Sequence, residues 1–137
     1  GAAVNTYHPM RVFVIPMRLP GLNEYIDAER THRQKAAKLK RLVQRDISAC
    51  ILDQLGGAAY DCPVDIEYTW YEPDRRRDKD NIAFAKKFIN DALVACGVLP
   101  NDGWRNIHTM FDMFSVDATN PRVEVMISPC YDEEAEA

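Results

Sequence analysis

The stretch that decides the fold is residues 64–71, which read Val-Asp-Ile-Glu-Tyr-Thr-Trp-Tyr. Apolar and polar side chains alternate along it, and a period of two is typical of a strand with one buried face. Pro63 precedes the stretch and Pro73 follows it, so both ends are marked. We therefore predict a β-strand here whose apolar side packs against a hydrophobic core.

The segments on either side of this strand complete a small α/β (α+β) domain. We predict further strands at residues 10–17, 107–116 and 123–127, and helices at residues 27–55 and 82–96. Apolar residues recur every three or four positions in both helices, and Gly56 and Gly97 end them. The order β-α-β-α-β-β predicts a small mixed β-sheet covered by two helices. We expect the last two strands to pair as a hairpin.

Length and composition indicate one globular domain. The chain has 137 residues, 47% of them hydrophobic, and a net charge of −4. We assign residues 1–131 to the domain and residues 132–137, Asp-Glu-Glu-Ala-Glu-Ala, to a solvated acidic tail. No stretch approaches the ~18 apolar residues of a membrane span, and no secretory signal is visible. We therefore expect a cytoplasmic protein.

The cysteines and histidines do not predict a metal centre. The four cysteines, at positions 50, 62, 96 and 130, form no Cys-x-x-Cys pair. This spacing indicates reduced thiols and argues against a zinc site. The three histidines, at positions 8, 32 and 108, also lack a ligand spacing, and we assign them no catalytic role.

The chemistry of the chain is concentrated in residues 75–81, which read Arg-Arg-Arg-Asp-Lys-Asp-Asn. Asp78 and Asp80 are two positions apart, so in an extended segment both carboxylates project from the same side. Carboxylates this close repel unless a cation compensates them. Mg²⁺ is commonly bound by one or two carboxylates together with water and phosphate oxygens. Asp102 completes such a site if the chain folds back after Gly97.

Simpler interpretations of the same residues remain open. Asp80 or Asn81 can be the N-cap of the helix that follows. Lys87 and Asp91 are four positions apart, and an ordinary surface pair at this spacing contributes ~0.3 kcal/mol.

Basic residues gather in two segments. Residues 29–46 carry seven basic side chains against two acidic ones, and the arginines of residues 75–77 form a second cluster. Local basic patches of this kind bind phosphate groups, but a solvated helix face is an equally open interpretation. The residues that we predict to contact DNA are Arg75, Arg76, Arg77, Arg30, Arg33, Lys38 and Arg41. Such contacts supply affinity and orientation, not base recognition.

Three motifs follow one another in residues 75–107. They read Arg76-Arg77-Asp78-Lys79-Asp80-Asn81, then Lys87-Phe88-Ile89-Asn90-Asp91-Ala92-Leu93, then Gly97-Val98-Leu99-Pro100-Asn101-Asp102. Together they resemble the signature of the RusA family of Holliday-junction resolvases. An N-terminal strand, a turn containing proline and a long basic helix precede the motifs in the same order as in that family.

The resemblance implies a Mg²⁺-dependent, homodimeric endodeoxyribonuclease of a family often carried by phages and prophages. Mn²⁺ is the expected substitute metal. The family's metal-binding acids match Asp78, Asp80 and Asp102, and its active-site lysine matches Lys87 when counted back from Asp91. The implied catalytic set is therefore Asp78, Asp80, Lys87 and Asp102.

Two departures from the family pattern keep alternatives open. The best-known form of the motif has three fewer residues between the Asp-x-Asp-Asn motif, here residues 78–81, and the acid of the following helix, here Asp91. Counting forward from Asp80 therefore puts the lysine position at Phe84, which leaves Lys86 as an alternative to Lys87. The residue before the last acid is often acidic in the family, whereas Asn101 here lowers the charge of the site.

The expected function is hydrolysis of phosphodiester bonds in Holliday junctions during DNA recombination and repair. One alternative is a broader nuclease that cuts flaps and other branched DNA. A second is a junction-binding module whose metal site is degenerate. A four-way junction has two-fold symmetry, which favours a homodimer with two equivalent sites.

Overall fold

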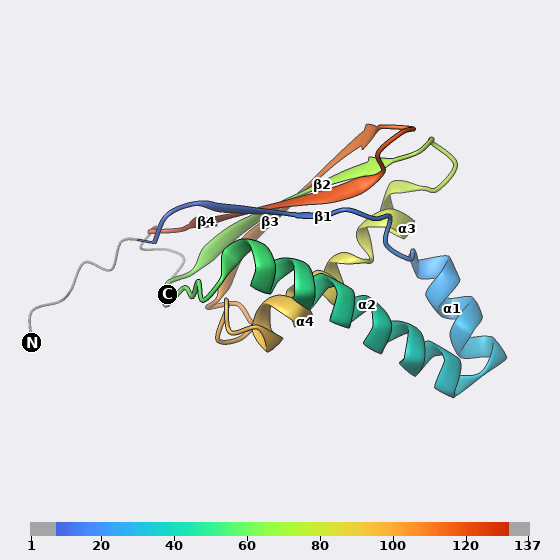
Figure 1. The fold of residues 1–137 in the computed structure, drawn as a ribbon, viewed down its shortest axis with the longest axis horizontal. Coiled ribbons are helices and arrows are strands. Elements are labelled where there is room, and N and C mark those ends of the chain that lie inside the picture. The colour runs from blue at the N-terminus through green and yellow to red at the C-terminus, as the bar shows by residue number, and fades with distance from the viewer. Residues whose placement is uncertain (1–7, 132–137) are drawn as a thin grey trace, which may run out of the picture.

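The protein folds into a four-stranded mixed sheet with helices on one of its faces (Figure 1). The structure is a computed structural model, and it describes residues 8–131. The elements follow in the order β1 (Arg11–Ile15), α1 (Leu22–Thr31), α2 (Arg33–Leu55), β2 (Val64–Glu72), α3 (Lys79–Ala83), α4 (Lys86–Ala95), β3 (Ile107–Val116) and β4 (Arg122–Pro129). The predicted acidic tail, residues 132–137, lies outside the described residues.

β2 is an inner strand of the sheet. Its side chains alternate between buried and half-buried from Val64 to Glu72, as the sequence pattern predicts. It pairs antiparallel with β4 on one side and parallel with β3 on the other, which gives the strand order β1-β4-β2-β3. The predicted mixed sheet of an α+β domain is therefore confirmed.

The predicted hairpin between the last two strands is wrong. β3 and β4 lie on opposite sides of β2, and the connection between them passes the end of that strand. There the backbone N–H of Asp117 donates to the carbonyl oxygen of Glu72 at 2.8 Å. Two strand spacings amount to about 10 Å, so a short connection can cross one strand as readily as it can close a hairpin.

Each of the two predicted helices is divided into two. α1 begins at Leu22, earlier than predicted, and His32 separates it from α2 with an extended backbone (φ −165°, ψ 124°). The Nδ1 atom of His32 accepts a hydrogen bond from the backbone N–H of Gln34 at 3.2 Å, which caps α2. This polar cap compensates the interruption of the helix.

The second division separates α3 from α4. Around it the chain makes hydrogen bonds to the third preceding residue, such as Ala85 N–H to the Ile82 carbonyl oxygen at 3.2 Å. These are the bonds of a tighter helical turn. Phe84 at this turn packs on Tyr25 of α1, with ring centroids 5.6 Å apart. The division therefore also fixes α1 against the start of α4.

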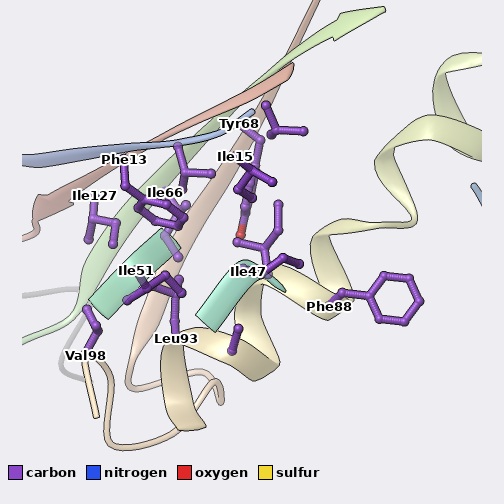
Figure 2. Close-up of a cluster of buried hydrophobic side chains, with 14 of the residues drawn as sticks. Phe13, Ile15, Ile47, Ile51, Ile66, Tyr68, Phe88, Leu93, Val98 and Ile127 are labelled. Carbon is purple, nitrogen blue, oxygen red and sulfur yellow. The ribbon is translucent and has the colours of Figure 1, made fainter. Parts of the chain in front are cut away.

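The core lies between the sheet and the longer helices. Figure 2 shows Phe13 and Ile66 of the sheet near Ile47 and Ile51 of α2 and Leu93 of α4, and all five are fully buried. Burial of one such side chain stabilises the fold by roughly 1.5–3 kcal/mol. The apolar spacing predicted for the two helices therefore does mark the faces that pack against the sheet.

Gly97 ends the helical segment after α4. Its φ of 76° lies in the left-handed region that side chains disfavour. The Val98 N–H then donates back to the Leu93 carbonyl oxygen at 3.0 Å, and Val98 is buried. The predicted role of this glycine is confirmed, and the chain returns along α4 toward Asp102.

The opposite face of the sheet carries no helix (Figure 1). Val12 of β1 and Phe111 and Met113 of β3 are exposed on this face. Among the helices of residues 8–131, none combines the length and apolar character needed to cross a membrane.

Candidate active site

Arg77 holds the segment after β2 against the rest of the protein. Its guanidinium donates from Nε and Nη2 to the two carboxylate oxygens of Glu72, each at 2.9 Å, and from Nη1 to the Leu19 carbonyl oxygen at 3.1 Å. Glu72 is only 6% exposed, and its charge is compensated by this bidentate pair together with Arg18, whose Nη2 donates to Glu72 Oε1 at 3.2 Å. Arg77 is thus engaged with protein groups, and its predicted contact with DNA stays a prediction.

Asp78 and Asp80 lie at the start of α3. Asp78 is the N-cap residue, with an extended backbone and no capping hydrogen bond from its side chain. The helix cap therefore falls on neither Asp80 nor Asn81, the two residues that the simpler interpretation proposed. Asp80 accepts a hydrogen bond from the Asn81 N–H at 2.9 Å. Both carboxylates are exposed, and within residues 8–131 neither forms an ion pair.

An open pocket lies beside Asp78. Its volume is about 560 Å³, and its lining includes Arg75, Lys79, Phe114 and Val116. The ammonium of Lys79 lies 5.5 Å from the centroid of the Phe114 ring, so this residue between the two aspartates is directed to β3. The pocket thus combines three carboxylates and three cationic side chains with an apolar wall.

Lys87 connects α4 with the segment after Gly97. Its Nζ lies 3.1 Å from Asp91 Oδ1 and 3.8 Å from Asp102 Oδ2. The hydrogen bond to Asp91 is the main reason that the pKa of Lys87 is raised, and the Asp102 carboxylate adds to it. The chain therefore does fold back to bring Asp102 near the predicted lysine, and Asp91 holds that lysine as expected.

Lys86 is directed to a different part of the protein. Its ammonium pairs with Asp112 of β3 and lies 5.3 Å from the centroid of the Tyr68 ring. Asp112 also accepts a hydrogen bond from Trp70 Nε1 at 2.9 Å. The side chain of Lys86 is 22% exposed, against 60% for Lys87. Of the two lysines that the sequence left open, only Lys87 lies next to a predicted metal ligand.

Asn90 completes the network around Lys86. Asn90 is a polar residue of α4, but it is buried and accepts a hydrogen bond from the Tyr68 hydroxyl. Burial is the main reason that the pKa of Tyr68 is raised, so the hydroxyl keeps its proton and remains a donor. The sequence signal for this network was Asp112, which is the one acidic residue in the predicted strand at residues 107–116.

α2 contributes two polar residues to the site that the prediction did not include. Gln44 Nε2 donates to Asp91 Oδ2 at 3.3 Å, and Lys40 Nζ lies 3.9 Å from the same oxygen. Both lie half-buried on the side of α2 that packs against α4. Lys40 belongs to the basic run of residues 29–46, but the sequence alone does not say which side of the helix faces α4.

The donor chemistry at Asp78, Asp80 and Asp102 suits Mg²⁺, which prefers oxygen ligands and binds through as few as one or two carboxylates. Asp78 and Asp80 carry negative charge that no cationic side chain within residues 8–131 neutralises. The three acids are not among the described groups whose ligand atoms all lie within 4.8 Å of one another. The structure thus brings Asp102 to Lys87 but does not gather the three carboxylates, so a metal held here would need water and substrate oxygens to complete its coordination.

Most of the predicted phosphate-binding residues lie free on the surface. Arg30 and Arg33 at the junction of α1 and α2, Lys38 and Arg41 of α2, and Arg75 are exposed and form no ion pair within the described part of the chain. Arg76 is exposed, with Asp74 3.6 Å away. Their side chains are thus available for an anionic partner.

Comparison with models of known protein families and with curated proteins finds no match for this chain.

Proposed function

We propose that this chain is a RusA-like, Mg²⁺-dependent endodeoxyribonuclease that resolves four-way DNA junctions. The observation that carries the proposal is the position of Lys87, whose ammonium lies 3.1 Å from Asp91 and 3.8 Å from Asp102. Asp102 comes from a segment beyond the end of α4, so this approach depends on the fold. It unites two of the three motifs on which the resemblance rests.

In the proposed mechanism, Asp78, Asp80 and Asp102 hold Mg²⁺, with Mn²⁺ as a substitute. A metal held by these residues would supply positive charge at the scissile phosphate and lower the pKa of bound water. Lys87 neutralises charge that develops on the phosphate oxygens in the transition state. Asp91 is a positioning residue, because it accepts a hydrogen bond from the Lys87 ammonium, which raises the pKa of that lysine and holds it beside Asp102.

The exposed basic residues hold the DNA in the proposed complex. Arg75 and Lys79 line the pocket beside Asp78, and Arg30, Arg33, Lys38 and Arg41 extend the basic surface along α1 and α2. Contacts of this kind are made with phosphates and give affinity without sequence preference. We expect branched DNA to be preferred because two basic surfaces of a dimer engage several arms at once.

A homodimer is part of the proposal. Two opposed strands of a junction need two equivalent sites, which a two-fold dimer provides. β3 is an edge strand of the sheet, and the exposed Met110, Phe111 and Met113 on it support assembly through this side of the protein. Sedimentation equilibrium is expected to give twice the chain mass.

The test is cleavage of a synthetic four-way junction, with matched flap and linear duplexes, in Mg²⁺ and in EDTA. The proposal predicts paired, symmetric nicks in the junction, only with Mg²⁺ or Mn²⁺. Equal cutting of all branched substrates would instead favour a general branched-DNA nuclease. Absence of cutting with every divalent metal tested would contradict the proposed nuclease activity.

One alternative has support of its own. The three carboxylates do not gather into one compact group in this structure, and Asn101 lies where the family often has a further acid. These observations favour a junction-binding module without turnover as the second candidate. It predicts tight, salt-sensitive junction binding in EDTA and no nicks in Mg²⁺.

A further inference from the structure

A second group of potential metal ligands lies at the opposite end of β2 from the candidate active site. Asp65 is at the start of β2, His108 is at the start of β3, and Cys130 directly follows β4. A strand rises about 3.3 Å per residue, so Asp65 lies roughly 23 Å from Glu72, beyond which Asp78 follows. This group is therefore separate from the proposed nuclease site, and it does not depend on that function.

The side chains of Asp65 and Cys130 both approach the Nδ1 nitrogen of His108. Asp65 Oδ1 lies 2.9 Å from it and Cys130 Sγ lies 3.5 Å from it. The hydroxyl of Thr109 is a third neighbour at 3.0 Å. The carboxylate, imidazole and thiol ligand atoms all lie within 4.8 Å of one another.

A single hydrogen bond at Nδ1 does not use all three of its neighbours. The Nδ1 atom of a neutral imidazole either donates one hydrogen or accepts one. If it donates to Asp65, it cannot also accept from the Cys130 thiol and the Thr109 hydroxyl. A cation bound by all three ligand types would remove this competition, because a neutral imidazole nitrogen, a thiolate and a carboxylate are each metal ligands.

The distances suit a small tetrahedral ion. Bonds of about 2.0–2.3 Å place two ligands of one tetrahedral zinc roughly 3.3–3.5 Å apart. The separation of 3.5 Å between His108 Nδ1 and Cys130 Sγ is already in this range. The separation of 2.9 Å between His108 Nδ1 and Asp65 Oδ1 has to lengthen by only about 0.4 Å.

The surroundings of the group are partly closed. Cys130 is 7% exposed, whereas the side chains of His108 and Asp65 are 34% and 33% exposed. The backbone N–H of Cys130 donates to the Pro63 carbonyl oxygen at 2.7 Å, which fixes the cysteine against the start of β2. The ligands come from three strands that lie side by side, β4, β2 and β3, so the sheet itself holds them in place.

We propose that Asp65, His108 and Cys130 form a zinc-binding site at this end of the sheet, with water as the fourth ligand. Nitrogen and sulfur donors favour zinc over Mg²⁺, which prefers oxygen ligands. Three protein ligands and one open position are typical of zinc sites that retain a bound water. The site joins three strands, and metal binding stabilises the folded state by an amount that grows with the logarithm of the free metal concentration.

The test is metal binding by the full chain after treatment with EDTA and dialysis. Isothermal titration calorimetry with Zn²⁺ is expected to show one ion bound per chain. Thermal unfolding is expected to show a higher midpoint when Zn²⁺ is present. Co²⁺ in place of Zn²⁺ is expected to give a thiolate-to-cobalt absorption band, which reports sulfur coordination directly. Failure to bind either ion at micromolar concentration would overturn the proposal.

Variants of the ligands separate this site from other thiols and histidines. Cys130→Ser, His108→Ala and Asp65→Asn are each expected to weaken Zn²⁺ binding at least about 10-fold, and Cys130→Ser to abolish the cobalt band. Cys50→Ser, which changes a cysteine of α2, is the matched control and should leave both unchanged. Circular dichroism in EDTA verifies that each variant is folded.

A second group of potential metal ligands could account for zinc binding instead. His8, Asp61 and Cys62 also bring an imidazole, a carboxylate and a thiol within 4.8 Å of one another. Loss of binding in His8→Ala with full retention in His108→Ala would overturn the assignment to Asp65, His108 and Cys130. Undiminished binding in all three ligand variants would do the same.

Discussion

Lys86 and Lys87 are neighbours in α4, but they lie in regions of opposite character. The ammonium of Lys86 is directed to the sheet, where Asp112 pairs with it and Tyr68 and Trp70 surround the pair. The ammonium of Lys87 is directed outward to Asp91 and Asp102. The comparison shows that a charged side chain enclosed by its partners, as Lys86 is at 22% exposure, serves the fold, whereas one left 60% exposed beside its partners, as Lys87 is, remains accessible to a ligand.

The largest expected effect is that of Asp80→Asn on the exposed region. The variant removes one charged metal ligand and leaves the phosphate-contacting arginines in place. Because a bound metal contributes several kcal/mol of charge stabilisation, we expect cleavage to fall by at least about 100-fold while junction affinity is retained. Single-turnover cleavage and a gel-shift titration measure the two quantities.

The control for this variant is Asp53→Asn, which changes an exposed acid of α2. It is expected to leave cleavage unchanged. Substantial Mg²⁺-dependent cleavage by Asp80→Asn would remove this residue from the mechanism.

Asp112→Ala tests the part-buried region. The substitution leaves Lys86 and the Trp70 N–H without their acceptor, and removal of one partner of a buried charged pair costs about 2–4 kcal/mol. We expect the free energy of unfolding in urea to fall by that amount, with cleavage per folded molecule retained. An unchanged unfolding midpoint, equal to that of Asp53→Ala, would mean that the network does not stabilise the fold.

The salt dependence of junction binding tests the basic surface around the exposed region. Each phosphate contact contributes about 0.9 to the slope of log affinity against log salt concentration. The double variant Arg30→Gln, Arg41→Gln is therefore expected to reduce the slope by about 1.8. Arg122→Gln, which changes an arginine already paired with Asp117 at 2.8 Å, is the control. An equal slope in both variants would contradict the assignment.

The smallest expected effect concerns the protonation of Lys87. Its pKa is raised, chiefly by the hydrogen bond to Asp91. The pair therefore contributes its stability below the ordinary lysine pKa and loses it as pH rises through the raised value. Asp91→Asn is expected to lower the pKa of Lys87 toward the ordinary value, as measured by NMR titration of the lysine Cε resonances. A pKa that does not fall would mean that Asp91 does not hold the ammonium.

Local sequence patterns predict whether a segment is a strand or a helix, and where it ends, when nearby residues determine this. The alternation in residues 64–71 predicts β2, and Gly97 predicts the end of the helical segment. Both depend on burial or backbone conformation within a few residues. The division at His32 does not follow from such patterns, because the apolar spacing continues into α2 and only the backbone of one residue changes.

Strand order and cross-strand contacts depend on distant segments. β4 lies beside β2 instead of beside β3, and the pattern within each strand does not specify which strand it pairs with. The pairing of β3 with β2 brings His108 to Asp65, and the pairing of β4 with β2 brings Cys130 to the same end of the sheet. His108 is 43 positions from Asp65 and 22 from Cys130, so no short motif could reveal that group.

The central claim is tested most directly by Lys87→Ala and Lys86→Ala, compared side by side with the unaltered protein. The measurement is the single-turnover rate of four-way junction cleavage at saturating protein and Mg²⁺. The account predicts that Lys87→Ala slows cleavage by about 100-fold or more, with junction binding retained, whereas Lys86→Ala lowers stability and keeps the rate. Loss of cleavage in Lys86→Ala with retention in Lys87→Ala would contradict the assignment of the site.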